Sequence, residues 1–219
     1  LLVQAFRAST IEVEDEEDDI VDEEGDLPRK AVRLRWWRRE LSRSLRGRSS
    51  YAILNQLSAA AHRFNIPVRH FYELVRGMEM DLVTTRYRSF EDLERYCTLV
   101  ASSVELMCRE IFGYRNESTR EYSIHLGIAL QLTNILRDLR DDAQRGRTYL
   151  PQEDPARFGY TEDDLLHSRY TPEFRALMAF ECARARTYFE RAKNALANED
   201  KRFFFAARVM SSIYIKTLN

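Results

Sequence analysis

Glycine and proline are scarce in this sequence, with seven and five among 219 residues. These two residues interrupt helices and build the tight turns that hairpins need. No run of alternating β-branched residues demands a strand either. The segments between the few turn signals hold apolar residues at helical spacing, and 44% hydrophobic content over this length is enough for one sizeable core. The composition therefore predicts an all-α, single-domain protein.

The sequence also lacks several kinds of catalytic motif. Its cysteines are three, an odd number without metal-ligand spacing, so we expect Cys97, Cys108 and Cys182 to be reduced core residues. The four histidines form no cluster at helical spacing, and no serine or cysteine stands in a recognisable nucleophile motif. No G-x-G-x-x-G is present, so a Rossmann-type nicotinamide site is not visible. The scattered histidines and the missing nucleophile motif disfavour hydrolase chemistry, whereas the missing glycine motif disfavours a reduction only weakly.

Long apolar runs are missing as well. No stretch approaches the roughly 18 apolar residues of a membrane span, and no export leader is visible, so we expect a cytoplasmic protein. A formal net charge of −1 argues against a nucleic-acid partner. The charge is uneven, because acidic residues 12–24 precede nine Lys/Arg within residues 29–48. This basic block could pair with the acidic run, contact anionic lipid headgroups, or form the solvated face of a helix, and the solvated face is preferred.

The spacing of apolar residues predicts eight helices, at residues 29–46, 50–64, 68–82, 90–112, 119–144, 161–168, 172–197 and 200–217. Ser89 with Asp92 and Thr161 with Asp164 resemble acidic capping boxes, and Pro172 stands where a first helical residue is expected. Gly113 and Gly146 stand where C-terminal caps are expected. Gly127 lies inside the helix predicted at residues 119–144. Its missing side chain would allow close packing or the approach of a ligand; the alternative is a glycine that the helix merely tolerates.

The most informative stretch is residues 131–142, which spaces acidic groups one helical turn apart. A step of four residues advances about 40° beyond a full turn, so Asn134, Asp138 and Asp142 form one stripe, with Gln131 a turn earlier. The other side of this helix is apolar, through Leu132, Ile135, Leu136 and Leu139. Carboxylates a turn apart repel each other, and Mg²⁺ suits such a sparse set because it keeps positions for water and substrate phosphates. A solvated helix face is the alternative.

A second acidic element far upstream repeats this spacing, at Asp18 and Asp22. If both helices line one cavity, their carboxylates can clamp a diphosphate through bridging Mg²⁺ ions. The alternative is a disordered, solvated acidic segment, because the surrounding residues 12–24 are so densely charged.

These elements occur together with further motifs, at residues 36–41, 71–82, 86–87, 96–97, 100–101, 111–113 and 146–151. In combination they resemble the squalene/phytoene synthase family of head-to-head prenyl transferases, from about residue 18 to the end. Within that family, residues 77–82, 150–154 and 157–159 look most like bacterial presqualene diphosphate synthases, with phytoene synthases close behind.

The resemblance implies an isoprenoid-synthase-type helical bundle around a central cavity and a Mg²⁺-dependent condensation of two farnesyl diphosphates to presqualene diphosphate. It also implies roles for individual residues. The metal ligands would be Asp18, Asp22, Asn134, Asp138 and Asp142. The catalytic residues would be Tyr96, Arg137 and Tyr149. The substrate would also contact Val100, Val104 and Gln131, besides Arg137 and Tyr149. A physical argument supports the tyrosines, because aromatic faces stabilise an allylic cation in a dry pocket.

Two alternatives remain open, namely a phytoene synthase that joins two geranylgeranyl diphosphates and a catalytically silent relative that serves as a binding or assembly module. The sequence also departs from the family. Residues 1–17 are expected to be an atypical, truncated acidic segment, and residues 18–219 a synthase-like domain that lacks its closing C-terminal helix. Ser102 and Ser103 replace small glycines, and Glu105 points either outward or into an apolar channel. Because a C₃₀ product is oily, we also expect transient contact with the inner membrane surface.

Overall fold

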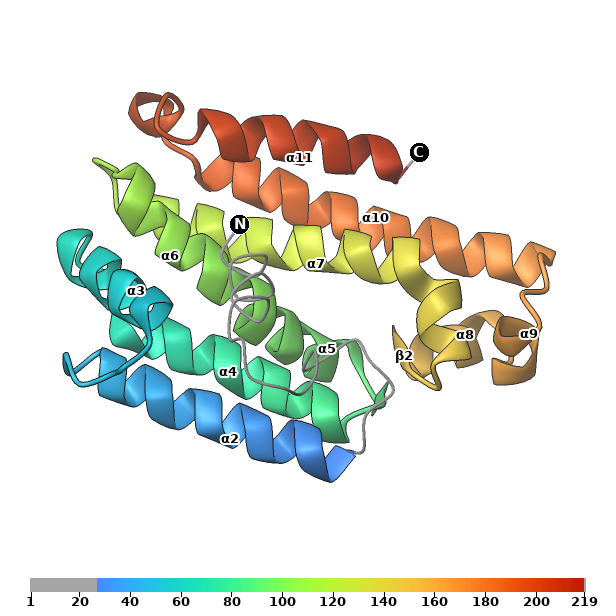
Figure 1. Cartoon of the computed structure of the whole chain (residues 1–219). Helices are drawn as coiled ribbons and strands as arrows, with labels where there is room; N and C mark the ends of the chain where they lie inside the picture. The colour runs from blue at the N-terminus through green and yellow to red at the C-terminus, as the bar shows by residue number, and fades with distance from the viewer. Residues whose placement is uncertain (1–26, 219) are drawn as a thin grey trace. The chain divides into compact units, whose positions relative to one another are not determined.

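The computed structural model describes residues 27–218, and most of them are helical (Figure 1). The α-helices are α2 Leu27–Ser44, α3 Ala52–Arg63, α4 Val68–Val83, α5 Phe90–Cys97, α6 Ser103–Phe112, α7 Thr119–Gln144, α8 Glu153–Phe158, α9 Glu162–Leu166, α10 Pro172–Ala195 and α11 Phe205–Thr217. A π-helical turn η1 spans Thr98–Ser102, a 3₁₀ turn η2 spans Asn198–Asp200, and two short strands are β1 Arg86–Tyr87 and β2 Thr148–Pro151. The all-α prediction is confirmed.

The chain divides into two compact units, residues 1–82 and 83–219. In the first unit, α2 packs against α3, and α4 lies beside α2 (Figure 1). Trp37 and Leu54 form the centre of the contact between α2 and α3, and Trp36 and Tyr51 pack against it. Arg38 of α2 donates to Glu79 of α4 at 3.2 Å. Helix α2 thus has a buried apolar side, which includes Leu34, Trp37 and Leu41, while several of its basic residues are exposed.

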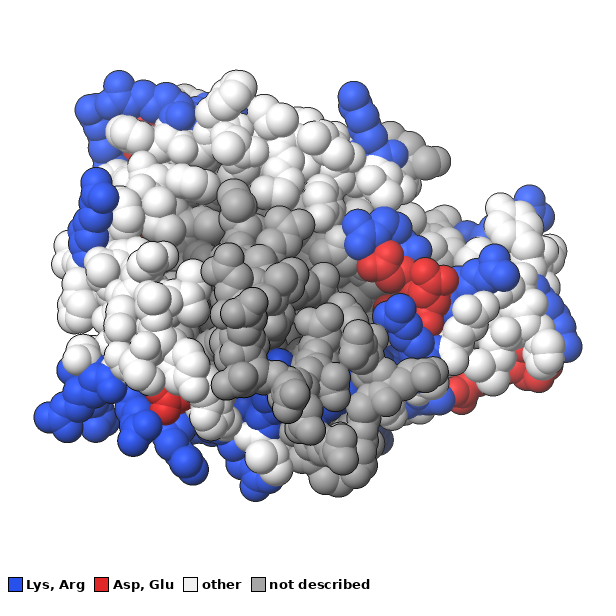
Figure 2. Space-filling view, viewed as in Figure 1, with Lys and Arg blue, Asp and Glu red and all other residues white. Residues whose placement is uncertain are grey.

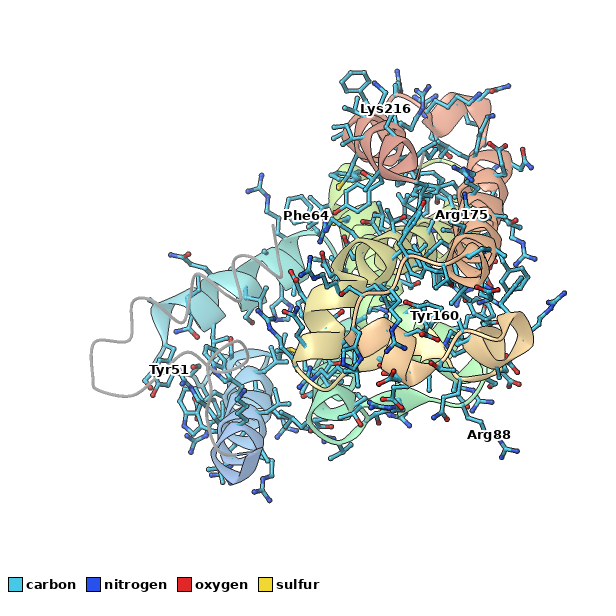
Figure 3. The ribbon with its side chains drawn as sticks, turned by 90° about the vertical axis from the view of Figure 1, so that its right-hand side faces the viewer. Tyr51, Phe64, Arg88, Tyr160, Arg175 and Lys216 are labelled. Carbon is cyan, nitrogen blue, oxygen red and sulfur yellow. The ribbon has the colours of Figure 1, made fainter. Side chains whose placement is uncertain are left out.

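The second unit is built around α7, the longest helix. Helix α10 runs along it, α11 lies on the same side, and α6 and η1 pack on another (Figure 1). Such extensive coverage explains why Leu126, Ala129 and Leu132 are almost fully buried although α7 also bears many charges. Figure 3 shows the contrast within this unit, where Tyr160 points inward and Arg88 extends away.

Local chemistry sets the helix ends as the sequence predicted. The Ser89 hydroxyl accepts the amide hydrogen of Asp92 at the start of α5, and Thr161 with Asp164 forms a full capping box on α9. Pro172 opens α10 behind the N-cap Thr171. Helix α6 ends on Gly113, whose φ of 77° is accessible to glycine without strain. The 26 residues of α7 match the predicted range at both ends.

One predicted helix is wrong, because residues 90–112 do not form a continuous α-helix. The π-helical turn at Thr98–Ser102 divides them into α5 and α6. At this turn the backbones of α7 and η1 approach each other closely. A Cβ on Gly127 would lie 2.5 Å from both Cα and N of Ser102, far inside contact distance. Gly127 therefore serves close helix packing, which was one of the open interpretations.

Two smaller differences concern short elements. Helix α9 is shorter than the predicted 161–168, and the chain between α7 and α9 forms β2 and α8, which the sequence did not indicate. None of the helices within residues 27–218 combines the length and the apolar content that crossing a bilayer requires.

Candidate active site

The predicted polar stripe of α7 forms a half-buried row. Gln131, Asn134, Asp138 and Asp142 are all intermediate in exposure, whereas the neighbouring Asp141 is exposed. Leu132, Ile135 and Leu139 on the other side of the helix are buried. A polar row that is half sheltered differs from a simple solvated face, because partly desolvated carboxylates need neutralising partners.

Arg137 supplies one such partner by clamping Asp138 with two parallel hydrogen bonds. Its Nε donates to Oδ1 and its Nη2 to Oδ2 of Asp138, each at 2.7 Å. These bonds hold the pKa of Asp138 below its usual range, and they raise that of Arg137. Tyr214, on α11, raises the pKa of Arg137 to a smaller extent. The C-terminal half of α7 thus presents a fixed cation beside the acidic row.

The pKa of Asp142 is shifted in the opposite direction from that of Asp138. Partial burial, and next the charge of Asp138 one turn earlier, raise its pKa, while Arg145 and Arg147 act in the other direction. Asn134 is unsatisfied too, because its Oδ1 atom is buried and has no hydrogen-bond partner among the described residues. An added cation would relieve the carboxylate repulsion and use this free amide oxygen.

A small parallel strand pair brings distant tyrosines to this end of α7. Arg86 of β1 faces Thr148 of β2, and Tyr87 faces Pro151. Backbone bonds from Thr148 N to Thr85 O at 3.0 Å and from Gln152 N to Tyr87 O at 2.9 Å extend the pair. Strand β2 begins four residues after α7 ends, so it places Tyr149 near the acidic row.

Tyr87, Tyr96 and Tyr149 form a compact aromatic cluster, which we call the tyrosine cluster. The ring centroid of Tyr96 lies 5.4 Å from the ring centroid of Tyr87 and 5.4 Å from that of Tyr149. The ring centroids of Tyr87 and Tyr149 are 6.0 Å apart. Tyr87 and Tyr96 are buried, while Tyr149 is half-buried and its hydroxyl accepts from Nη1 of Arg147 at 3.4 Å. Three aromatic faces near a row of carboxylates suit a cationic hydrocarbon paired with an anion.

The predicted hydrocarbon-contacting residues lie on the η1 and α6 segment. Val100 is within the π-helical turn and Val104 within the first turn of α6, and both are half-buried. Single π-helical turns are frequent at functional sites. Glu105 is also half-buried, and burial raises its pKa to about 7. The charge of Glu105 in turn raises the pKa of Tyr122 on α7, so its electrostatic influence extends to the helix that bears the acidic row.

A buried network of charged residues, Arg184, Asp154 and Glu181, lies next to the end of β2. Arg184 of α10 donates to Asp154 at 2.7 and 3.2 Å and to Glu181 at 2.7 Å. Its guanidinium also lies 4.2 Å from the ring centroid of Phe90 at the start of α5. Asp154 follows β2 directly at the start of α8, so this network links the segments that bear Tyr149 and Tyr96.

The network predicts an unusual dependence of stability on pH. Burial first, and the neighbouring Asp154, raise the pKa of Glu181 above its ordinary 4.5, so the folded state keeps a proton that the unfolded chain releases. The free energy of unfolding should therefore fall as the pH rises above that value. Glu181→Gln should remove this fall and be more stable than the wild type by about 1–2 kcal/mol at about pH 8.5.

Urea unfolding across this pH range measures the effect. Glu190→Gln is the matched control, because Glu190 is an exposed residue of the same helix that pairs with Lys193. If the free energy of unfolding depends on pH equally in the wild type and in Glu181→Gln, the Glu181 carboxyl is not protonated in the folded state.

The described part of the site fits Mg²⁺ by the chemistry of its donors, which are two carboxylates and an unpartnered amide oxygen. Within residues 27–218, no three His, Cys, Asp or Glu side chains lie close enough to hold an ion by themselves. The predicted first acidic motif, Asp18 and Asp22, lies outside the described residues. A shared metal site therefore stays a prediction.

Four residues of this region were assigned no role from sequence. Tyr214 is 77 residues beyond Arg137, and nothing in the α11 pattern indicated the contact. Tyr87, Arg145 and Arg147 belong to or adjoin motifs that the resemblance used. Both arginines could have been found from the sequence, because they follow Asp142 by three and five residues and can offset its charge.

Comparison with known proteins agrees with this arrangement. A sequence model of the family described as squalene/phytoene synthase matches residues 13–219. The 15-cis-phytoene synthase of Synechococcus elongatus is 37% identical over 191 residues, which cover 82% of this chain and 62% of that protein. The chloroplastic phytoene synthase of Narcissus pseudonarcissus is 39% identical over 166 residues, which cover 73% of this chain and 39% of that protein. The chain therefore spans less than two thirds of these relatives.

Solved structures share the fold. The squalene synthase HpnC from Alicyclobacillus acidocaldarius superposes with a TM-score of 0.81 at 26% identity, over 99% of this chain and 80% of that one. A dehydrosqualene synthase crystallised with a ligand gives a TM-score of 0.80 at 26% identity, over 98% and 72%.

Proposed function

The chain belongs to the squalene/phytoene synthase family, and from that membership we propose that it catalyses the Mg²⁺-dependent head-to-head condensation of two prenyl diphosphates. The observation that carries this proposal is the half-buried row on α7, where the unpartnered oxygen of Asn134 lies in line with Asp138 and Asp142. The tyrosine cluster beside β2 supports it, because it supplies aromatic faces for a carbocation.

In this proposal, Asn134, Asp138 and Asp142 hold Mg²⁺ together with Asp18 and Asp22. The bound metal supplies Lewis-acid stabilisation of the departing diphosphate. Arg137 offers the same anion its positive charge and the N–H donors that Asp138 leaves free, and Gln131 lines the wall beside it.

The reaction proceeds by ionisation of one substrate. Its C1–oxygen bond breaks, pyrophosphate leaves with the electron pair, and the double bond between C2 and C3 of the second substrate attacks the allylic cation. Loss of a proton to the departed pyrophosphate then closes a cyclopropane ring. Tyr96 and Tyr149 face the cation, while Val100 and Val104 contact the hydrocarbon chains and exclude water. Tyr149 also offers its hydroxyl to pyrophosphate.

For the chain length of the substrate we propose farnesyl diphosphate, which gives presqualene diphosphate. The motifs at residues 77–82 and 150–154 support this assignment, and so does the structural likeness to squalene and dehydrosqualene synthases. The curated relatives favour a second candidate, since they are named phytoene synthases, and a synthase of that kind would join two geranylgeranyl diphosphates.

Offering each diphosphate separately tests both levels of the proposal. We expect Mg²⁺-dependent pyrophosphate release that EDTA abolishes, with a C₃₀ cyclopropyl diphosphate from farnesyl diphosphate identified by mass. A product from geranylgeranyl diphosphate alone would replace the substrate assignment and keep the reaction class. No release from either substrate at saturating Mg²⁺ would indicate a silent family member that serves as a binding module.

A further inference from the structure

The outer side of α2 bears a row of arginines that the proposed catalysis does not use. Residues 27–50 contain nine Lys/Arg and one acid, Glu40. Arg35 and Arg39 are exposed and lie about 40° apart on α2, on the side away from the buried Leu34 and Trp37. Arg46 is exposed in the turn that follows α2. Arg43 and Arg48 continue the exposed surface. We call these five arginines the arginine face.

Among residues 27–218, little acidic charge compensates the positive charge of this face. Glu40 is 4% exposed and already accepts from Arg43 Nη1 at 2.9 Å and from the Ser49 hydroxyl at 3.4 Å. Arg39, Arg46 and Arg48 form no ion pair with any other residue of the described chain. Figure 2 shows Lys and Arg gathering at the lower left, over the C-terminal half of α2 and the loop that follows it.

An open pocket of about 440 Å³ lies at this end of the face. The residues that line it are Ser42, Arg43, Arg46, Arg48 and Ser50. Every charged group of this lining is a hydrogen-bond donor, and no carboxylate is part of it. Such a pocket has the size and the chemistry to accept a phosphate group.

We propose that the arginine face is a docking surface for the anionic phospholipid headgroups of a bilayer, with the pocket holding one lipid phosphate. Exposed guanidinium groups on one side of α2 and on the loop after it match the negative charge of an anionic bilayer surface. Single-stranded nucleic acid fits less well, because it needs aromatic rings for base stacking. Trp37 is buried, and Trp36 packs edge-on against Trp37 and Tyr51 at 5.2 and 5.1 Å. The proposal stands whether or not the protein is catalytically active.

Flotation with lipid vesicles tests it. The protein should float with vesicles that contain about 30% phosphatidylglycerol and not with pure phosphatidylcholine. Raising the salt from about 0.1 M to about 1 M shortens the Debye length from about 10 Å to about 3 Å and should release it. Each arginine lost should lower the partition coefficient about fivefold, so that Arg35→Gln, Arg39→Gln and Arg46→Gln together lower it about a hundredfold.

A control variant with the same change in net charge isolates the surface. Arg120, Lys193 and Arg202 are exposed residues of the second unit, and changing all three to glutamine should leave vesicle binding unaltered. Circular dichroism melting checks that both triple variants fold. A folded α2 variant that floats like the wild type overturns the proposal. So does equal loss in both variants, or binding of single-stranded RNA through the face without binding of vesicles. Binding of millimolar inorganic phosphate by a protein that does not float with anionic vesicles would assign the pocket to free phosphate and overturn the docking surface.

Discussion

Asp138→Asn is expected to lower Mg²⁺-dependent pyrophosphate release by about 10²–10³-fold at saturating metal, the usual cost of losing one electrostatic contact to a transition state. Asparagine keeps the shape of the side chain and removes the charge that a metal ion requires. It also converts a bidentate ion pair with Arg137 into one neutral hydrogen bond, so the cation is no longer fixed in place. Because the Asp138 side chain is 43% exposed, little stability should be lost.

The matched control is Asp141→Asn on the same helix. Asp141 is exposed and lies off the row of residues spaced by four, so this substitution should change the rate less than about twofold. Pyrophosphate release measured over a range of Mg²⁺ concentrations separates the two effects. Full activity of Asp138→Asn at saturating Mg²⁺ would show that the acidic row does not bind metal.

Gly127→Ala is expected to destabilise the second unit by about 3 kcal/mol or more, although it adds only one methyl group. The new Cβ would lie 2.5 Å from backbone atoms of Ser102 and 2.8 Å from the carbonyl carbon of Ala101. Backbone atoms cannot rotate away as the end of a side chain can, so α7 and η1 would have to separate. The Ser102 hydroxyl, which donates to Ile124 O at 2.8 Å, would lose its geometry as well.

Gly159→Ala distinguishes this steric effect from an ordinary loss of glycine. A Cβ at Gly159 meets no atom within 4 Å, and only the φ of 69° opposes it, at a cost of about 1–2 kcal/mol. Urea midpoints of the two variants and the wild type give the comparison. Similar destabilisation of both variants would mean that α7 and η1 accommodate the methyl group.

The helices could be predicted from sequence because each rests on local chemistry. Helix α7 shows the period of 3.6 over 26 residues, and Ser89, Thr161 and Thr171 cap their helices through hydroxyls that lie next to them in the chain. The half-burial of Asn134, Asp138 and Asp142 followed from the same periodicity, because the opposite side of the helix is apolar.

The rest depended on contacts between distant segments. A π-helical turn at residues 98–102 differs from an α-helix in its hydrogen bonds and not in its residue types, so periodicity cannot reveal it. Strands of two and four residues are too short to show a period of two. The contact of Tyr214 with Arg137 arises only when α11 lies on α7. The pairing of Asp18 and Asp22 with the α7 row remains a prediction.

The pairing of β1 with β2 has a consequence for how the protein matures. It joins residues 86 and 148, and the whole of α5, η1, α6 and α7 lies between them. Closing a loop of that length is entropically slow, so the three rings should come together only once the intervening helices have docked. A nascent chain that has not yet emerged beyond β2 would hold Tyr87 and Tyr96 without their third neighbour. The tyrosine cluster would therefore assemble as a late step of folding, after the helices between β1 and β2 have docked.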